Sequence, residues 1–426
     1  MTEISRRDLL AGAAGAVGGA VLAGLPSLAE GQQSSAAKSA AKAAAVAAPP
    51  PLPPIPDDAT KITGTPTTTV GTRSRFVNAV RTPVGQITGV SFTPLQDLTG
   101  TITPSDLHFE RHHAGIPLID PAKHSLMIHG LVDRPMMFSV DDIKRFPQVT
   151  RVHFVECSGN GRGSYRDLKP ETTVQLVAGM TSNSEWTGVP LKVLFEEAGA
   201  KPEAKWFLAE GGDASMLTRS IPMEKAYEDA LVVWAQNGEP MRPEQGYPLR
   251  LLLPGFEGNA NVKWLRRLEL GTRPWMTRWE TSKYTDPLLD GKARIFSFEI
   301  DAKSVITSPT YPAAITKGWW PVSGLAWSGR GKITRVEVST DSGKTWHDAT
   351  IHGPALSKAH MRFTHMWEWD GRETTLLSRA TDETGYTQPT RSDLIKIRGA
   401  GTDYHFNPIY GWTVKSDGHV FFHGAT

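Results

Sequence analysis

The sequence contains a single cysteine, Cys157, among 426 residues. One thiol has no partner for an intramolecular disulfide, and it cannot build the Cys-x-x-Cys-His motif that attaches a c-type heme. A structural zinc site takes about four ligands at regular spacing, which one cysteine and scattered histidines do not supply. Cys157 is therefore a buried bystander, an intermolecular bridge or a functional thiolate.

The sequence also lacks an excess of either charge. It has 46 Lys plus Arg against 44 Asp plus Glu, and no basic stripe. A nucleic-acid partner is therefore not expected. Apolar residues make up 39% of the chain, enough for a large core, and the length favours two or three domains.

The longest uncharged apolar run lies near the N-terminus. Twin arginines, Arg6 and Arg7, precede a weakly apolar, Gly- and Ala-rich stretch that ends at Leu25, and small residues follow at 27–29. The stretch is barely long enough to span a membrane. The pattern is typical of a twin-arginine export signal, so residues 1–29 are predicted to be a signal peptide and the mature chain to be periplasmic, with no membrane span.

Composition then changes along the chain. Residues 30–61 are rich in Ala, Ser, Lys and Pro, which predicts a disordered, polyproline-like leader or a segment that docks on a partner. Residues 62–290 mix short strands and short helices, which indicates an α+β domain. The expected elements are a helix capped by Ser139, a buried strand at 152–155, a helix from Pro190 to Ala198 ended by Gly199, and a strand at 249–253.

The last part of the chain, residues 291–426, has a different texture. An alternating run at 333–339 is followed by a turn at 340–343 and by renewed strand character at Thr345 and Trp346. This is a hairpin signal, and further short strands with Gly and Pro turns follow. We expect an all-β sandwich of immunoglobulin-like kind.

Cys157 itself stands where a strand gives way to a turn. Gly159 and Gly161 let backbone approach a ligand closely, and Asn160 and Arg162 add polar donors. A thiolate in such a place suits a transition metal or covalent catalysis. The nearest preceding histidine, His153, is poorly spaced to act as the base of a cysteine hydrolase. The local pattern alone does not choose between these chemistries.

The wider pattern resembles the sulfite oxidase family of molybdenum enzymes. Five segments carry the resemblance in order, from about residue 100 to the C-terminus: Phe109–His113, Glu156–Arg162, Gly246–Leu265, Trp279–Tyr284 and Ala326–Trp346. The resemblance implies a molybdopterin-binding α+β domain followed by an immunoglobulin-like dimerisation domain, and molybdenum-molybdopterin as the cofactor. Within the family the sequence is most similar to the periplasmic enzymes that dehydrogenate sulfane sulfur.

Residue roles follow from the resemblance. Cys157 is implied to be the molybdenum ligand, while the pterin supplies further sulfur atoms. Arg111 is implied to hold an anionic substrate, and Tyr284 to donate a hydrogen bond in the pocket. The residues implied to bind the pterin or its phosphate are His113, Asp213, Arg250, Asn261 and Lys263. Arginine and lysine suit a phosphate because of their charge.

The sequence departs from the family pattern in two places. Gln245 stands where a cofactor-anchoring histidine is expected, and residues 407–411 lack a second substrate arginine. Loss of a positive charge disfavours free sulfite as substrate and favours sulfane sulfur on a carrier protein. Because the chain has no heme motif, electrons are expected to pass to a c-type cytochrome subunit, and a homodimer is expected to form through the C-terminal domain.

Several alternatives remain beside this interpretation. Within the enzyme class these are a sulfite dehydrogenase, which passes electrons from sulfite to cytochrome c, and a sulfoxide reductase. Relatives of the latter lack the sandwich domain, which counts against it. Outside that class, the chain could be an exported binding module whose cysteine forms an intermolecular disulfide. Molybdenum content separates the enzyme from the module.

Overall fold

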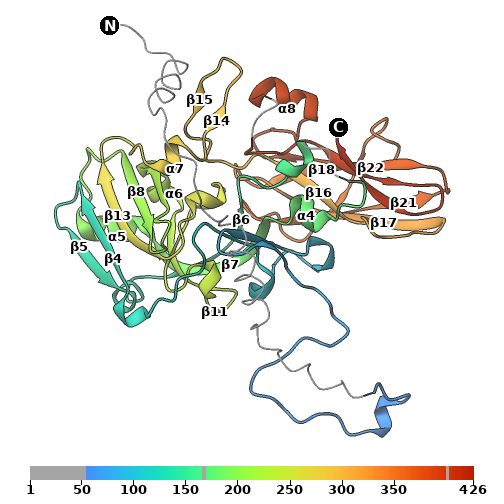
Figure 1. Ribbon diagram of the computed structural model, residues 1–426, viewed down its shortest axis with the longest axis horizontal. Coiled ribbons are helices and arrows are strands. Elements are labelled where there is room, and N and C mark those ends of the chain that lie inside the picture. The colour runs from blue at the N-terminus through green and yellow to red at the C-terminus, as the bar shows by residue number, and fades with distance from the viewer. Residues whose placement is uncertain (1–53, 166–168, 400–402) are drawn as a thin grey trace, which may run out of the picture. The chain divides into compact units, whose positions relative to one another are not determined.

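A computed structural model describes residues 54–165, 169–399 and 403–426 (Figure 1). The predicted signal peptide and residues 30–53 of the predicted leader lie outside these ranges. Contacts divide the chain into a unit that ends at Arg73 and a compact unit, Ser74–Thr426. In the first, a short 3-10 helix η1 (Ala59–Lys61) is capped by Asp58. Across the described ranges, every helix is too short or too polar to cross a membrane.

The N-terminal part of the second unit contains three small sheets. One has the strand order β5-β4-β13-β8-β9, with only β4 and β13 parallel, and another has the order β11-β10-β7-β6, with β12 beside β10. The third runs β1-β2-β3. The strands are β1 (Thr82–Gly85), β2 (Gly89–Phe92), β3 (Glu110–His112), β4 (Ser125–Gly130), β5 (Met136–Ser139), β6 (Val149–Glu156), β7 (Thr181–Pro190), β8 (Trp206–Gly211), β9 (Thr218–Pro222), β10 (Leu231–Gln236), β11 (Glu239–Pro240), β12 (Arg250–Leu252) and β13 (Leu265–Gly271).

Short helices connect these strands, which confirms the α+β prediction. The α-helices are α3 (Val140–Ile143), α4 (Val174–Ala178), α5 (Leu191–Ala198), α6 (Met223–Glu228) and α7 (Arg278–Thr281). The 3-10 helices are η2 (Leu95–Asp97), η3 (Ser105–Leu107), η4 (Pro121–Lys123), η5 (Arg162–Tyr165), η6 (Pro243–Gln245) and η7 (Gly258–Ala260).

The predicted elements form close to where the sequence places them. Ser139 caps α3 in a reciprocal capping box with Asp142, although the helix ends earlier than expected. Apolar side chains of α5 recur every three or four residues and are buried, and Gly199 ends the helix at a positive φ of 70°. The buried strand at 152–155 is the second half of β6.

The C-terminal part is an antiparallel sandwich, as expected. One sheet has the order β16-β17-β21-β20 and the other β19-β18-β22-β23-β24. The strands are β16 (Lys303–Ser308), β17 (Gly318–Trp327), β18 (Ile333–Ser339), β19 (His347–Asp348), β20 (Thr350–His352), β21 (Met361–Trp369), β22 (Thr374–Asp382), β23 (Tyr410–Val414) and β24 (Val420–Ala425), and a small hairpin of β14 (Asp286–Pro287) and β15 (Ala293–Arg294) precedes them. Helix α8 (Arg391–Arg398) follows β22. The predicted hairpin is confirmed, since β18 pairs with β19.

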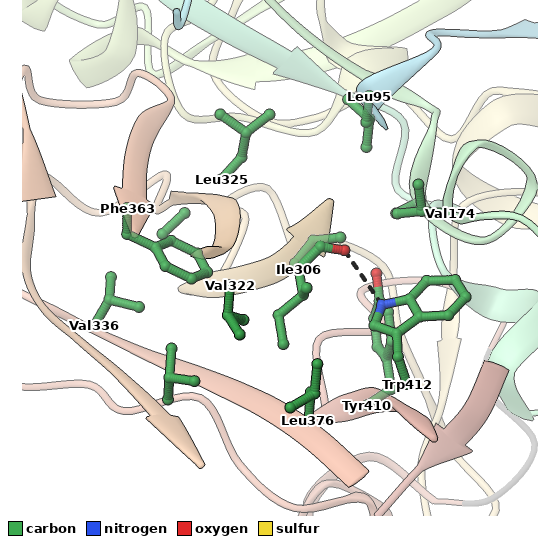
Figure 2. Packing of buried hydrophobic residues seen from close by; sticks show 14 of the residues in the cluster. Leu95, Val174, Ile306, Val322, Leu325, Val336, Phe363, Leu376, Tyr410 and Trp412 are labelled. Atoms are coloured by element: carbon green, nitrogen blue, oxygen red, sulfur yellow. Dashed lines mark hydrogen bonds between the residues drawn. The ribbon is translucent and has the colours of Figure 1, made fainter. Parts of the chain in front are cut away.

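The sandwich encloses a core in which large aromatic and aliphatic side chains interlock (Figure 2). Trp412 is fully buried, and its indole Nε1 donates to the Ile306 carbonyl at 3.3 Å. The same buried cluster includes Leu95, Phe154 and Val174 from the N-terminal part of the chain. Because the two parts share this core, the domain boundary predicted at residue 290 stays a prediction.

Candidate functional site

One cavity brings together all eight residues that the sequence singled out. It is partly open to solvent. Its lining consists of Phe109, Glu110, Arg111, His112, His113, Val155, Cys157, Asp213, Leu217, Gln245, Arg250, Gly258, Asn259, Asn261, Lys263, Trp264 and Tyr284. Strands β3, β6 and β12 supply five of these residues, and the others come from the 3-10 helices η6 and η7 and from loops, including the one between β8 and β9.

Cys157 lies at the end of β6, where the chain leaves the sheet. Its backbone N–H donates to the Met180 carbonyl at 3.0 Å, and its own carbonyl accepts from Asn160 N at 2.9 Å. Gly258 passes directly behind it, where a side-chain Cβ would lie 3.2 Å from the Cys157 Cα. Burial raises the pKa of the thiol, while the charges of Arg111 and Arg162 act in the opposite direction. The thiol is thus protonated at neutral pH until a cation displaces its proton.

The histidine nearest before Cys157 does not join it. Among the described residues that line the cavity, His153 is not included. Its Nδ1 instead lies 3.3 Å from the Lys358 carbonyl oxygen, and burial lowers its pKa to about 4. A Cys–His pair of the hydrolase type is therefore not built here.

Arg250 and Lys263 supply positive charge to the cavity wall. Burial lowers the pKa of Arg250 to about 9, and burial together with Arg250 lowers that of Lys263 to about 7. Neither cation has a carboxylate within ion-pair distance among the described residues. Arg250 Nη1 donates to the Gln245 backbone carbonyl at 3.1 Å, while its Nε has no partner in this part of the chain. A buried and a half-buried cation without a carboxylate within ion-pair distance point to an anionic ligand.

Lys263 is held by the protein itself. Its ammonium lies 3.1 Å from the Arg111 carbonyl, 2.9 Å from His112 Nδ1 and 3.0 Å from the Glu244 carbonyl. His112 is fixed in turn by Glu110, whose carboxylate lies 2.7 Å from its Nε2. An ammonium has three protons, and these three acceptors use all of them. Lys263 would therefore attract an anionic ligand through its charge and not through a free N–H.

The two predicted catalytic residues, Arg111 and Tyr284, both line the cavity. Tyr284 OH lies 2.8 Å from His113 Nε2, and burial followed by the charge of Cys157 raises the pKa of the phenol. Burial and Arg111 lower the pKa of His113 to about 4, so the imidazole is neutral, and its tautomer decides whether it donates to the phenol or accepts from it. Arg111 Nη1 contacts the carbonyls of Gly89 and His112.

Two further predicted residues are occupied by structural contacts. Asp213 accepts from Ser215 Oγ at 2.5 Å. Asn261 accepts from Leu253 N at 2.7 Å and donates to the carbonyls of Phe256 and Glu257 at 3.1 Å. Asn261 therefore shapes the loop behind Cys157, and its amide has little capacity left for a ligand.

Sequence reasoning missed His112, which stands inside a quoted motif but received no role. Gln245 was noted only as a departure from the family pattern, yet its Nε2 donates to the Phe109 carbonyl at 2.9 Å and its Oε1 lies 3.3 Å from Arg250 Nη1. Arg162 was noted only as a polar donor beside Cys157. The signal that could have identified these residues is that each is polar and lies next to a motif residue in the sequence.

The segment that lacks the second arginine begins beside Cys157, where Asn407 lines a small pocket, and continues into the sandwich. Residues 405–412 are buried, and Tyr410 belongs to the core of the sandwich, with 5% of its surface exposed. An arginine at Tyr410 would be buried in that core. The absence of an arginine at position 410 therefore does not lower the positive charge around Cys157, to which Arg111 and Arg162 contribute.

The residues present fit a molybdopterin group. The lining includes the Cys157 thiol, which a soft metal can bind, and the cations of Arg250 and Lys263, which suit a phosphate. The buried Nε of Arg250 and the buried Oδ1 of Asn259 lack partners among the described residues, which leaves polar groups for a ligand to satisfy.

Comparison with known protein families gives two matches. A model described as the oxidoreductase molybdopterin binding domain matches residues 113–279. A model described as the Mo-co oxidoreductase dimerisation domain matches residues 294–410. The first contains six of the eight site residues, while Arg111 lies just before it and Tyr284 just after it.

Individual proteins give a concordant picture. The crystal structure of the sulfane dehydrogenase SoxCD from Paracoccus pantotrophus is similar with a TM-score of 0.82 and 47% identity, over 85% of this chain and 95% of that one. NADH nitrate reductase of Solanum lycopersicum is 31% identical over 68% of this chain and 36% of its own length. Mitochondrial sulfite oxidase of Mus musculus is 27% identical over 70% of this chain and 60% of its own. The chain thus spans about a third of the nitrate reductases it matches.

Proposed function

The chain belongs to the molybdopterin-binding oxidoreductase family that includes sulfite oxidase, and on this premise we propose that it oxidises sulfane sulfur held on a carrier protein. Each two-electron step has the balance R–S–S⁻ + H₂O → R–S–SO⁻ + 2 H⁺ + 2 e⁻. Water provides the oxygen, and the two electrons leave through a c-type cytochrome subunit.

One observation carries the proposal. The lone thiol, the cations of Arg250 and Lys263, and the Tyr284–His113 pair converge on one cavity. The 47% identity to a sulfane dehydrogenase over 85% of this chain supports sulfane sulfur as the substrate class. When bound, the molybdenum cofactor supplies oxygen transfer to sulfur and a sink for the electrons.

The protein's own residues bind and orient. Cys157 would hold the metal, and Arg250 and Lys263 would hold the anionic end of the pterin. Arg111 would offset the negative charge of the terminal sulfur, because cations close to a developing anion stabilise it strongly in a partly dry site. Arg162, whose charge also acts on Cys157, would assist from the exposed side.

Tyr284 and His113 would handle hydrogen bonds at the reacting sulfur. Tyr284 keeps its proton at neutral pH, since its pKa is raised, and it is therefore a donor throughout the physiological range. In the tautomer that carries its proton on Nε2, the neutral His113 donates to the Tyr284 oxygen, which orients the phenol and leaves its own proton free for the substrate.

The setting of the reaction is part of the proposal. The twin-arginine pattern of residues 1–29 supports export to the periplasm. A single cysteine rules out a covalently attached c-type heme in this chain, so a separate cytochrome has to accept the electrons. The match of residues 294–410 to a dimerisation domain supports a homodimer formed through the sandwich.

Sulfite dehydrogenation is the second candidate. It is favoured by the similarity to mouse sulfite oxidase and by the two cations, Arg111 and Arg162, beside Cys157. The sequence argument against sulfite relied on residues 407–411, of which Tyr410 lies in the sandwich core and Asn407 lines a small pocket beside Cys157.

Steady-state kinetics of the purified protein separate the two candidates. The assay follows cytochrome c reduction with either free sulfite or a persulfide-loaded carrier protein as the donor. We expect turnover with the carrier and little with sulfite. Efficient sulfite oxidation without carrier oxidation would replace the first candidate with the second, and absence of molybdenum from the isolated protein would exclude both.

A further inference from the structure

The loop that carries Cys157 is braced by the C-terminal sandwich. Glu156, the residue before the cysteine, is 1% exposed. Its carboxylate accepts from Lys303 Nζ at 2.6 Å and from the Trp327 indole Nε1 at 2.6 Å. Lys303 begins β16 and Trp327 ends β17, so both donors belong to the sandwich. Two charge-assisted hydrogen bonds of this length are strong and directional.

The same carboxylate closes a ring of hydrogen bonds around Cys157. Asn160 Nδ2 donates to Glu156 at 2.8 Å, and Asn160 Oδ1 accepts from Met180 N at 3.1 Å. The Met180 carbonyl then accepts the N–H of Cys157 at 3.0 Å. A displacement of the Glu156 carboxylate is therefore passed through Asn160 and Met180 to the backbone of the cysteine.

The far end of the loop meets the C-terminal part of the chain again. The Ser158 carbonyl accepts from His405 N at 2.8 Å. Gly161 has a positive φ of 83°, and a Cβ there would lie 3.0 Å from a ring carbon of Phe406. Residues 156, 158 and 161 are thus each fixed by residues beyond position 300.

We propose that the sandwich has a second role beside dimerisation: Lys303 and Trp327 are positioning residues that set the orientation of Cys157 at the metal. The inference rests on the proposed role of Cys157 as the molybdenum ligand. Residues that orient a metal ligand through hydrogen bonds tune the metal, and their loss typically costs about 10- to 100-fold in metal affinity or activity.

A pair of matched tryptophan substitutions tests the role. Trp327→Phe removes the donor to Glu156, whereas Trp412→Phe removes a donor to the Ile306 carbonyl in the same core (Figure 2). Both tryptophans are 0% exposed, so both substitutions are expected to lower the melting temperature. The readouts are the electron paramagnetic resonance spectrum of Mo(V) in the holoenzyme, kcat and KM.

Only the first substitution is expected to reach the metal. In Trp327→Phe the Mo(V) g values should shift and kcat should fall about 10-fold while KM is nearly unchanged, because the ligand and not the substrate pocket is displaced. Trp412→Phe should keep the wild-type spectrum. Equal spectral shifts in both variants, or a wild-type spectrum in Trp327→Phe, would overturn the inference.

A second variant covers the case in which Trp327→Phe does not fold. Lys303→Arg keeps the charge but places a planar guanidinium against Glu156, which should move the carboxylate without leaving it unpaired. The same shift of the Mo(V) g values is expected, and an unshifted spectrum overturns the inference. A wild-type protein without a molybdenum signal would instead refute the proposed function, so the two failures are distinguishable.

Discussion

The two sides of the Cys157 loop treat buried charge in opposite ways. On the sandwich side, Glu156 has Lys303, Trp327 and Asn160 as partners, and its carboxylate is fully satisfied. On the cavity side, Arg250 and Lys263 have depressed pKa values and no carboxylate within ion-pair distance in the described part of the chain. Paired charge on the sandwich side therefore stabilises the fold, whereas unpaired charge on the cavity side is available to bind an anionic ligand.

The largest effect is expected at the residue between the two sides. Cys157→Ser replaces a soft thiolate with a hard, weakly acidic hydroxyl. Turnover should fall by more than the roughly 100-fold that loss of a supporting partner costs. Pterin content should change little, because Arg250 and Lys263 remain. Substantial activity at full molybdenum occupancy in this variant would contradict the assignment of Cys157 as ligand.

A substitution on the sandwich side should lower the stability of the protein more than its affinity for the cofactor. Lys303→Met leaves the Glu156 carboxylate buried without its cation, which typically costs about 3–5 kcal/mol. Urea denaturation of the cofactor-free protein measures the change. Lys415→Met is the matched control, since its partner Glu373 is exposed and such pairs contribute about 0–1 kcal/mol. Equal losses of unfolding free energy in Lys303→Met and Lys415→Met would show that the buried ion pair of Glu156 contributes no more to stability than an exposed pair.

The cavity side should show the reverse pattern. Arg250→Met removes a buried, unpaired charge together with its hydrogen bonds to Gln245, so the stability of the cofactor-free protein should change by no more than about 1 kcal/mol. Pterin affinity should fall about 10- to 100-fold, the equivalent of one charge-assisted hydrogen bond. Fluorescence of released pterin measures retention, and Arg335→Met, on the exposed surface of the sandwich, is the control. A large loss of stability without loss of pterin would show that Arg250 is architectural.

A further expected effect is a dependence of stability on pH. The folded, cofactor-free protein releases the Lys263 proton at a pKa of about 7, while an unfolded lysine holds it up to about 10.4. Between these values the unfolded chain binds more protons, so the free energy of unfolding should rise with pH from about 7 to 10. Lys263→Met should lose this slope, and bound pterin should flatten it in the wild type. A slope of opposite sign in the wild type would contradict the depressed pKa.

Much of the site was predictable because its chemistry is concentrated in short motifs. A lone cysteine at a strand end, with Gly and Asn after it, marked Cys157 without any knowledge of the fold. Arg111, Arg250 and Lys263 were found through the resemblance of their short motifs to those of the sulfite oxidase family. The sandwich was predictable from local alternation and turn residues alone, since both are properties of neighbouring positions.

The remainder depended on contacts between distant positions. Only the tertiary structure places Lys303 beside Glu156, 147 residues away, and only there does Tyr410 prove to belong to a core. Likewise, the three acceptors around Lys263 come from two distant segments, at 111–112 and at Glu244, so its bonding could not be inferred from its neighbours. The sequence by itself determined which residues carry the chemistry, because five short motifs in order carry the resemblance to the sulfite oxidase family. Packing decided which charges are satisfied, because pairing requires side chains from different strands to meet in a dry interior.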